Sequence, residues 1–147
     1  MTLAELSAFV GRELAVTDWL EITQERINQF ADATGDHQWI HVDQERAERE
    51  SPYGSTIAHG FLTLSVLPKF LSDVVHLDDV RMTINYGLNR VRFPLAVRAG
   101  ARIRARIVLQ STRDVADAIE AAYLITVECQ GAERPCCVAE MLARYYG

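Results

Sequence analysis

The stretch Gly35-Asp36-His37-Gln38-Trp39-Ile40-His41 brings carboxylate and imidazole groups together in a short polar segment. Asp36 and His41 lie five positions apart, a spacing that a turn of the chain can fold into one small site. A carboxylate and an imidazole that share one water can exchange protons with that water and with a substrate. The pair would suit the addition of water to a polarised double bond, or its removal.

The same residues also allow a purely structural interpretation. Asp36 would then cap the chain after Gly35, and His41 would pack as a buried polar residue with its hydrogen bonds satisfied. The spacing alone leaves both interpretations open.

A second stretch with chemical potential is Ala58-His59-Gly60, directly before an apolar run. The N–H groups in the first turn of a helix have no intrahelical acceptor, so they could polarise a thioester carbonyl oxygen as an oxyanion hole does. Glycine would let a ligand approach Gly60 closely. Alternatively, the helix start simply needs a small residue there. His59 either touches a substrate pocket or packs at the helix start.

The elements that position these stretches can be read from hydrophobic spacing. A helix begins after Thr23, a good N-cap residue, and Gly35 ends its apolar pattern. The segment 36–43 is expected to be a loop, and 44–49 a short charged helical turn. The run from Phe61 to Val75 is apolar nearly all round, as in a buried helix. Pro68 lies inside it, so either the helix kinks or two helices meet there.

Beyond Asp79 the hydrophobic period becomes two, which predicts strands. The residues of this segment alternate most clearly between Ile103 and Leu109. The segment 17–22 is expected to be extended. The predicted strands are Arg81–Tyr86, Asn89–Phe93, Ala101–Gln110, Ala118–Cys129 and Cys136–Tyr146. This pattern predicts an α+β class with a long antiparallel sheet. One buried helix cannot cover both faces, so we expect the sheet to wrap around it and to pair with another subunit.

The length and composition of the chain limit which classes of protein it can belong to. The chain of 147 residues is expected to form one domain, residues 1–147, and its net charge of -5 argues against nucleic acid as a partner. No apolar run is long enough for a transmembrane helix, and the N-terminus does not resemble a secretory signal. The three cysteines include the adjacent Cys136 and Cys137, which we interpret as free thiols in the cytoplasm. No paired metal-ligand spacing exists, so no metal site is expected.

Together with Asn85-Tyr86-Gly87-Leu88-Asn89-Arg90-Val91-Arg92-Phe93, the two stretches resemble the MaoC-like (R)-specific enoyl-CoA hydratase family, over nearly the whole chain. Gly35, Asp36, Ile40 and His41 match the hydratase motif of that family. The chain looks especially like the stand-alone mycobacterial-type hydratases with a single hot-dog domain.

The resemblance implies a hot-dog fold, in which a curved antiparallel sheet wraps around a long helix. It implies a homodimer that hydrates a trans-2-enoyl-CoA in fatty acid metabolism, with no cofactor beyond the coenzyme A of the substrate. Asp36 and His41 would be the catalytic pair, the Gly60 amide would hold the thioester oxygen, and Ser65 would orient the catalytic groups. Further acyl-CoA contacts could come from a wider set, namely His59, Asn85, Gly87, Arg90 and Arg92.

Gln38 and Trp39 depart from the family motif, which has Asn and Pro at these positions, so the loop shape and the acyl-chain preference could differ. Three alternatives accompany the enoyl-CoA hydratase. They are a dehydratase that acts on acyl carrier protein, a non-catalytic acyl-binding subunit, and a thioesterase. A hot-dog thioesterase would need a carboxylate on the central helix, and the segment Phe61–Phe70 has none.

Overall fold

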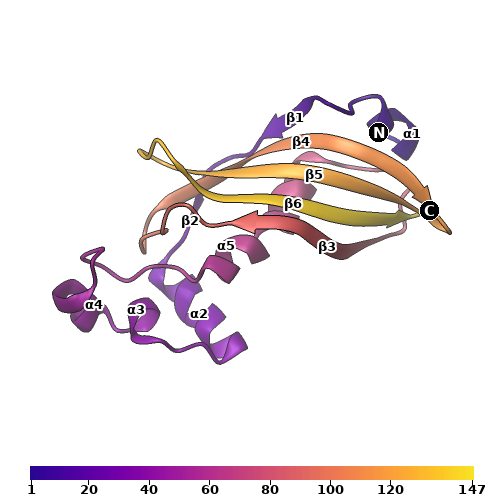
Figure 1. The fold of residues 1–147 in the computed structure, drawn as a ribbon. Helices are drawn as coiled ribbons and strands as arrows, with labels where there is room; N and C mark the ends of the chain where they lie inside the picture. The colour runs from indigo at the N-terminus through magenta and orange to yellow at the C-terminus, as the bar shows by residue number, and fades with distance from the viewer.

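The computed structural model describes residues 1–147 as a six-stranded antiparallel sheet in the order β1-β4-β5-β6-β3, with β2 also paired to β4. The long strands curve together as an arch (Figure 1). The strand bounds are Glu13–Val16 for β1, Leu20–Glu21 for β2, Met82–Arg92 for β3, Arg102–Val115 for β4, Ala118–Cys129 for β5 and Pro135–Tyr146 for β6.

Helices α2, α3 and α4 gather below the arch, beyond one end of it, whereas α1 lies at the opposite end (Figure 1). The helix bounds are Leu3–Ser7 for α1, Gln24–Thr34 for α2, Trp39–Val42 for α3, Gln44–Glu50 for α4, Gly60–Ser65 for α5 and Leu67–Val74 for α6. Pro68 lies in the first turn of α6, where no backbone N–H is needed. Two short helices therefore meet at Val66 in place of one kinked helix. None of the helices has the length and hydropathy that a bilayer crossing requires.

The core lies between the sheet and the α5–α6 pair. Strand β4 turns Ile103, Ala105, Ile107 and Leu109 to this side, and each of them is completely buried. Helix α6 contacts β4 and helix α5 contacts β6, so the helices cover the concave face of the sheet. Because strand side chains alternate between faces, the opposite residues of β4 lie on the outer face. The predicted α+β class is confirmed.

Two strand predictions need correction. Arg81–Tyr86 and Asn89–Phe93 form one strand, β3, because its pairing with β6 continues through register shifts at Asn85/Gly87 and Leu88/Arg90. Strand β1 lies in a segment for which no strand was expected, since four residues carry too little periodicity to be detected.

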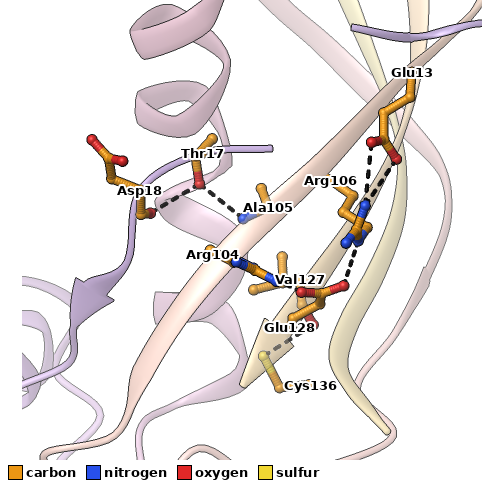
Figure 2. A network of polar contacts seen from close by, with 9 residues as sticks. All are labelled: Glu13, Thr17, Asp18, Arg104, Ala105, Arg106, Val127, Glu128 and Cys136. Carbon is orange, nitrogen blue, oxygen red and sulfur yellow. Dashed lines mark hydrogen bonds and ion pairs between the residues drawn. The ribbon is translucent and has the colours of Figure 1, made fainter. Parts of the chain in front are cut away.

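Thr17 ties the segment between β1 and β2 to the sheet. Its hydroxyl accepts the Ala105 N–H at 3.0 Å and donates to the Asp18 carbonyl oxygen at 3.0 Å (Figure 2). The residue is buried, so both bonds satisfy a polar group that water does not reach. These bonds hold the extended segment that leads into α2.

Charged side chains on the outer face pair with one another. Glu128 accepts from Arg104 at 2.8 Å and from Arg106 at 2.5 Å, and Arg106 also reaches Glu13 at 3.2 Å (Figure 2). Both arginines are therefore engaged in ion pairs within the sheet, as is typical of a solvated strand face.

Candidate functional site

An open surface cavity of about 510 Å³ lies where α2, α3 and α5 meet the end of β3. Cavities of this size accommodate small ligands. The residues that line it are Phe30, Thr34, Asp36, His41, His59, Gly60, Phe61 and Phe93. His41, His59 and the predicted carboxylate of Asp36 thus face one space, together with three phenylalanine rings.

Local folding explains how Asp36 and His41 reach this cavity. The Thr23 hydroxyl caps α2 by accepting the Arg26 N–H, and Gly35 ends the helix in the left-handed conformation with φ of 77°. Asp36 follows this sharp exit. The predicted loop is in part helical, because α3 begins at Trp39 and carries His41.

The cluster formed by Asp36, His41 and His59 is compact. A carboxylate oxygen of Asp36 and a ring nitrogen from each histidine all lie within 4.8 Å of one another. The Asp36 side chain is 54% exposed, whereas His41 is 7% exposed. Two polar atoms at such a separation can be bridged by one water through two hydrogen bonds of about 2.8 Å each.

The hydrogen bond of His41 determines its tautomer. Its Nδ1 lies 2.7 Å from the Ile57 carbonyl oxygen, and a carbonyl only accepts, so Nδ1 carries the proton. The unprotonated Nε2 is then free to act as a base. Burial lowers the pKa of His41 below 6.5, and the neighbouring His59 lowers it further, against the opposing influence of the Ile57 carbonyl and Asp36. The neutral, basic form of the ring is therefore favoured near neutral pH.

Gly60 is the first residue of α5 and is exposed to the cavity. Its N–H belongs to the first helical turn, which has no intrahelical acceptor for it. A Cβ added at Gly60 would lie 3.2 Å from the Phe93 ring, a tight contact. Both a ligand oxygen and the Phe93 ring can therefore approach the backbone here because the residue has no side chain.

His59 also lines this cavity but is almost completely buried. The side chain is 3% exposed, and its Nε2 bonds the Asp36 carbonyl oxygen at 2.9 Å. Its ring is stacked on that of His41, with centroids 3.8 Å apart and planes inclined by 22°.

The other predicted substrate contacts lie outside this cavity. The Ser65 hydroxyl donates to the Phe61 carbonyl oxygen at 2.6 Å, one helical turn back, and the side chain is exposed. Asn85 lines a separate cavity between α6 and β3, and Gly87 follows the register shift of β3. In this single chain the structure does not bring Ser65, Asn85 or Gly87 to the Asp36–His41 pair.

Arg90 and Arg92 are on the outer face of β3. They pair in register with Glu140 and Val138 of β6, whereas the buried Ala139 between those two faces the core. Arg92 directly precedes Phe93, so it lies near the mouth of the cavity without lining it.

Gln24, which no sequence pattern singled out, supports the site from α2. Its side-chain amide donates to the His41 carbonyl oxygen at 2.7 Å, and its amide oxygen accepts a short hydrogen bond from the Thr56 hydroxyl. Gln24 thereby joins α3 to the segment before α5. No sequence signal pointed to it, because its partners lie 17 and 32 positions away.

Several other chemistries fit the structure poorly. Two of the four ring nitrogens in this cluster, His41 Nδ1 and His59 Nε2, are bound to backbone carbonyl oxygens and are therefore not available as metal ligands. The first carboxylate of α5 or α6 is Asp73, which is bound to Lys69 at 2.6 Å, so no helix carboxylate serves a thioesterase. Burial raises the pKa of Cys136 to about 12 and of Cys137 to about 11, which suppresses the thiolate that a nucleophile needs.

Comparisons with known proteins place these observations in context. The family description "MaoC like domain" matches residues 5–128. The chain is 48% identical over 145 residues to 3-hydroxyacyl-thioester dehydratase Z of Mycobacterium tuberculosis, covering 98% of this chain and 95% of that protein.

Two solved structures show the same fold. The R-hydratase PhaJ1 from Pseudomonas aeruginosa superposes with a TM-score of 0.71 at 20% identity, covering 93% of this chain and 81% of that one. The HadBC complex of M. tuberculosis, a 3R-hydroxyacyl-ACP dehydratase, has a TM-score of 0.67 at 20% identity, covering 88% of this chain and 94% of the matched one. The predicted hot-dog fold is confirmed.

Proposed function

This chain belongs to the MaoC-like dehydratase family, and from that premise we propose that it catalyses the reversible (R)-specific hydration of trans-2-enoyl-CoA to 3-hydroxyacyl-CoA. One observation carries the proposal. The Asp36 carboxylate and an imidazole nitrogen of His41 lie within 4.8 Å in an open cavity that also exposes the Gly60 backbone. Membership of the family supports hydro-lyase chemistry, and the chemistry of this pair supports the particular reaction.

In the proposed mechanism one water donates one hydrogen bond to Asp36 and a second to the unprotonated Nε2 of His41. The water oxygen then attacks C3 of the enoyl thioester, and the pair accepts the proton that the water releases. The electrons of the C2–C3 double bond move toward the thioester oxygen. A proton from the pair is delivered to C2, which restores the protonation state of the enzyme and completes the addition of one water.

The developing negative charge on the thioester oxygen requires a donor. The Gly60 N–H is proposed to supply it, because this amide has no intrahelical acceptor and no side chain shields it. The phenylalanine rings around the cavity would exclude bulk water from the reacting carbons, which strengthens such a hydrogen bond. In the reverse direction the same groups would remove water from a 3-hydroxyacyl thioester.

The thioester carrier is the second part of the proposal. Coenzyme A is the expected carrier, with Arg90 and Arg92 as candidate contacts for its phosphates because they lie on β3 next to Phe93. Acyl carrier protein is the alternative, since HadBC, which shares the fold, is a 3R-hydroxyacyl-ACP dehydratase. A comparison of both thioesters in one assay separates the two.

A homodimer is the expected assembly. Strand β3 pairs only with β6, so its other edge is free along all eleven residues. Large apolar side chains on it are 42–53% exposed, namely Met82, Ile84, Tyr86 and Leu88. A long apolar edge strand attracts another strand, and a second copy of β3 is the self-complementary occupant. The free thiols Cys129, Cys136 and Cys137 support a reducing compartment, for which we propose the cytoplasm.

The test follows the absorbance of the conjugated enoyl thioester with crotonyl-CoA, with a longer trans-2-enoyl-CoA and with the corresponding acyl carrier protein thioester. Rapid loss of absorbance with the CoA substrates supports the hydratase. Turnover only with the carrier-protein substrate favours the alternative. No turnover with any of them would leave a non-catalytic acyl-binding subunit.

A further inference from the structure

His59 lies at the centre of the contacts beneath the catalytic pair. It precedes the first residue of α5, and its side chain is 3% exposed. Its ring stacks on His41 with a centroid distance of 3.8 Å and packs against Phe30 at 4.9 Å in a tilted arrangement. His59 lines the cavity, but a side chain so enclosed makes most of its contacts with the protein.

The hydrogen bond of His59 determines its protonation pattern. Nε2 lies 2.9 Å from the Asp36 carbonyl oxygen, and because that oxygen only accepts, Nε2 must donate. Nδ1 is buried and has no hydrogen-bond partner. The hydrogen bond therefore places a proton on Nε2 of His59.

The two histidines carry opposite tautomers and connect the same two chain segments in opposite directions. His41, from the segment 36–41, donates Nδ1–H to the carbonyl oxygen of Ile57. His59, from the segment 57–59, donates Nε2–H to the carbonyl oxygen of Asp36. The Ile57 N–H also donates to the Ile40 carbonyl oxygen at 3.0 Å. Three hydrogen bonds thus fix the distance between the segments that carry the reacting groups.

We propose that His59 is a positioning residue for the hydration–dehydration reaction: its Nε2–H holds the Asp36 backbone and its ring face supports the His41 ring. This inference rests on the proposed function, since it concerns the geometry of the same pair. The carboxylate of Asp36 is 4.0 Å from His59 Nε2, farther than the backbone oxygen, so the carboxylate remains available to a water. Displacement of a reacting group by about 1 Å can cost about 10²-fold in rate.

Two substitutions separate the two contacts of His59. His59→Phe keeps an aromatic face for His41 and removes the donor, whereas His59→Gln keeps an N–H donor at a similar reach and removes the ring. We expect His59→Phe to lower kcat by about 10²-fold with KM within about threefold. The kcat of His59→Gln should be at least about tenfold higher than that of His59→Phe, because its side-chain N–H can still donate to the Asp36 carbonyl oxygen.

His37→Gln is the matched control. His37 is exposed and its Nε2 contacts Asp32 at 2.9 Å, on the outside of the same loop. This variant should keep kcat within about threefold. If both His59 variants also do so, or if the loss in both is confined to KM, the positioning role is wrong, and the second result would indicate a substrate contact.

A spectroscopic readout is independent of turnover. Nitrogen-15 NMR of the imidazoles should show wild-type His59 protonated on Nε2 and His41 protonated on Nδ1. The His41 signal should persist in His59→Phe, which keeps the aromatic face, and broaden or shift in His59→Gln, which removes it. A wild-type His59 without a proton on Nε2, or an unchanged His41 signal in His59→Gln, would overturn the proposal even if a variant folds poorly. An inactive wild type with these NMR signatures would instead refute the proposed function alone.

Discussion

His41 donates its Nδ1–H to the carbonyl oxygen of Ile57 across 2.7 Å, and this bond leaves Nε2 as the nitrogen without a proton. The bond joins α3 to the chain segment just before α5, so the orientation of the imidazole depends on the packing of two elements. The Asp36 carboxylate is more than half exposed and accepts a long hydrogen bond of 3.4 Å from the Gln38 N–H. The pair therefore combines one rigid base with one accessible carboxylate.

The first prediction concerns the pair itself. Asp36→Asn and His41→Gln should each lower kcat for crotonyl-CoA hydration by about 10²–10⁴-fold, because each removes a proton-transfer group while leaving similar volume. KM should change much less than kcat. A combined variant should lose little more than the more severe single variant, since the two residues act on one water.

His37→Gln provides the baseline for these variants, because His37 lies in the same loop and faces solvent. Circular dichroism should show all of the variants folded. Full activity in either Asp36→Asn or His41→Gln would contradict the assignment of that residue.

The pH dependence follows from the direction of the His41 shift. Burial and the neighbouring His59 lower the pKa of His41 below 6.5, while Asp36 acts in the opposite direction. Because the reaction needs the neutral base, the acid limb of kcat/KM should have its midpoint below 6.5. Rates measured from about pH 5 to about pH 8 will locate it. A midpoint above 6.5 would mean that the environment of His41 is misassigned.

The same shift affects stability. Between the folded pKa and 6.5, the unfolded chain binds more protons at His41 than the folded protein does. The free energy of unfolding should therefore fall as pH decreases through that window, and the stabilising contribution should be fully present above 6.5. Urea unfolding of wild type and His41→Gln across the window isolates this contribution, since the variant has no ring to titrate.

Gly60 gives a prediction about close approach. Gly60→Ala should lower kcat/KM by at least about tenfold, because a Cβ would crowd both the Phe93 ring at 3.2 Å and the proposed path of the thioester oxygen. The double variant Gly60→Ala/Phe93→Leu relieves only the contact with the ring. If the double variant regains full activity, the contact with the ring accounts for the loss in Gly60→Ala. That result would give no support to the proposed oxyanion role of Gly60.

Ser65 tests an expectation that came from the resemblance alone. Its hydroxyl is bound to the Phe61 carbonyl oxygen and faces solvent in the single chain. On this geometry Ser65→Ala should keep kcat within about threefold of wild type. A loss comparable to that of Asp36→Asn would show that Ser65 reaches the reacting groups in the assembled enzyme, as the resemblance implied.

The local pattern of the chain was sufficient to predict most elements. Thr23 and Gly35 mark the ends of α2, and the alternation from Ile103 to Leu109 identifies the buried face of β4. These signals are detectable because capping and period-two burial depend on neighbouring residues. Strand β1 escaped detection, since its four residues form a strand only through pairing with β4.

The residue types of the site and the proximity of Asp36 and His41 could be predicted, but the contacts that support them could not. The five-residue spacing of Asp36 and His41 suggested one site, and the structure places both in one cavity. The buried position of His59 and the support from Gln24 could not be inferred, because both depend on contacts between segments far apart in the chain. Without coordinates, a histidine at a helix start could equally touch substrate or support another residue.

The last prediction concerns the free edge of β3. Ile84 is 43% exposed on this strand, whose unpaired backbone groups offer a second copy of the chain a place to bind. Wild type should sediment at twice the 16.5 kDa of one chain. Ile84→Lys should shift the equilibrium toward monomer, because a buried interface would leave the ammonium group without a partner.

Gln110→Lys, at an exposed position of β4, adds the same charge elsewhere and should leave the dimer intact. If Ile84→Lys remains dimeric while Gln110→Lys dissociates, the interface lies on the outer face of the sheet. A monomeric wild type would show that the chain functions alone or pairs with a different subunit.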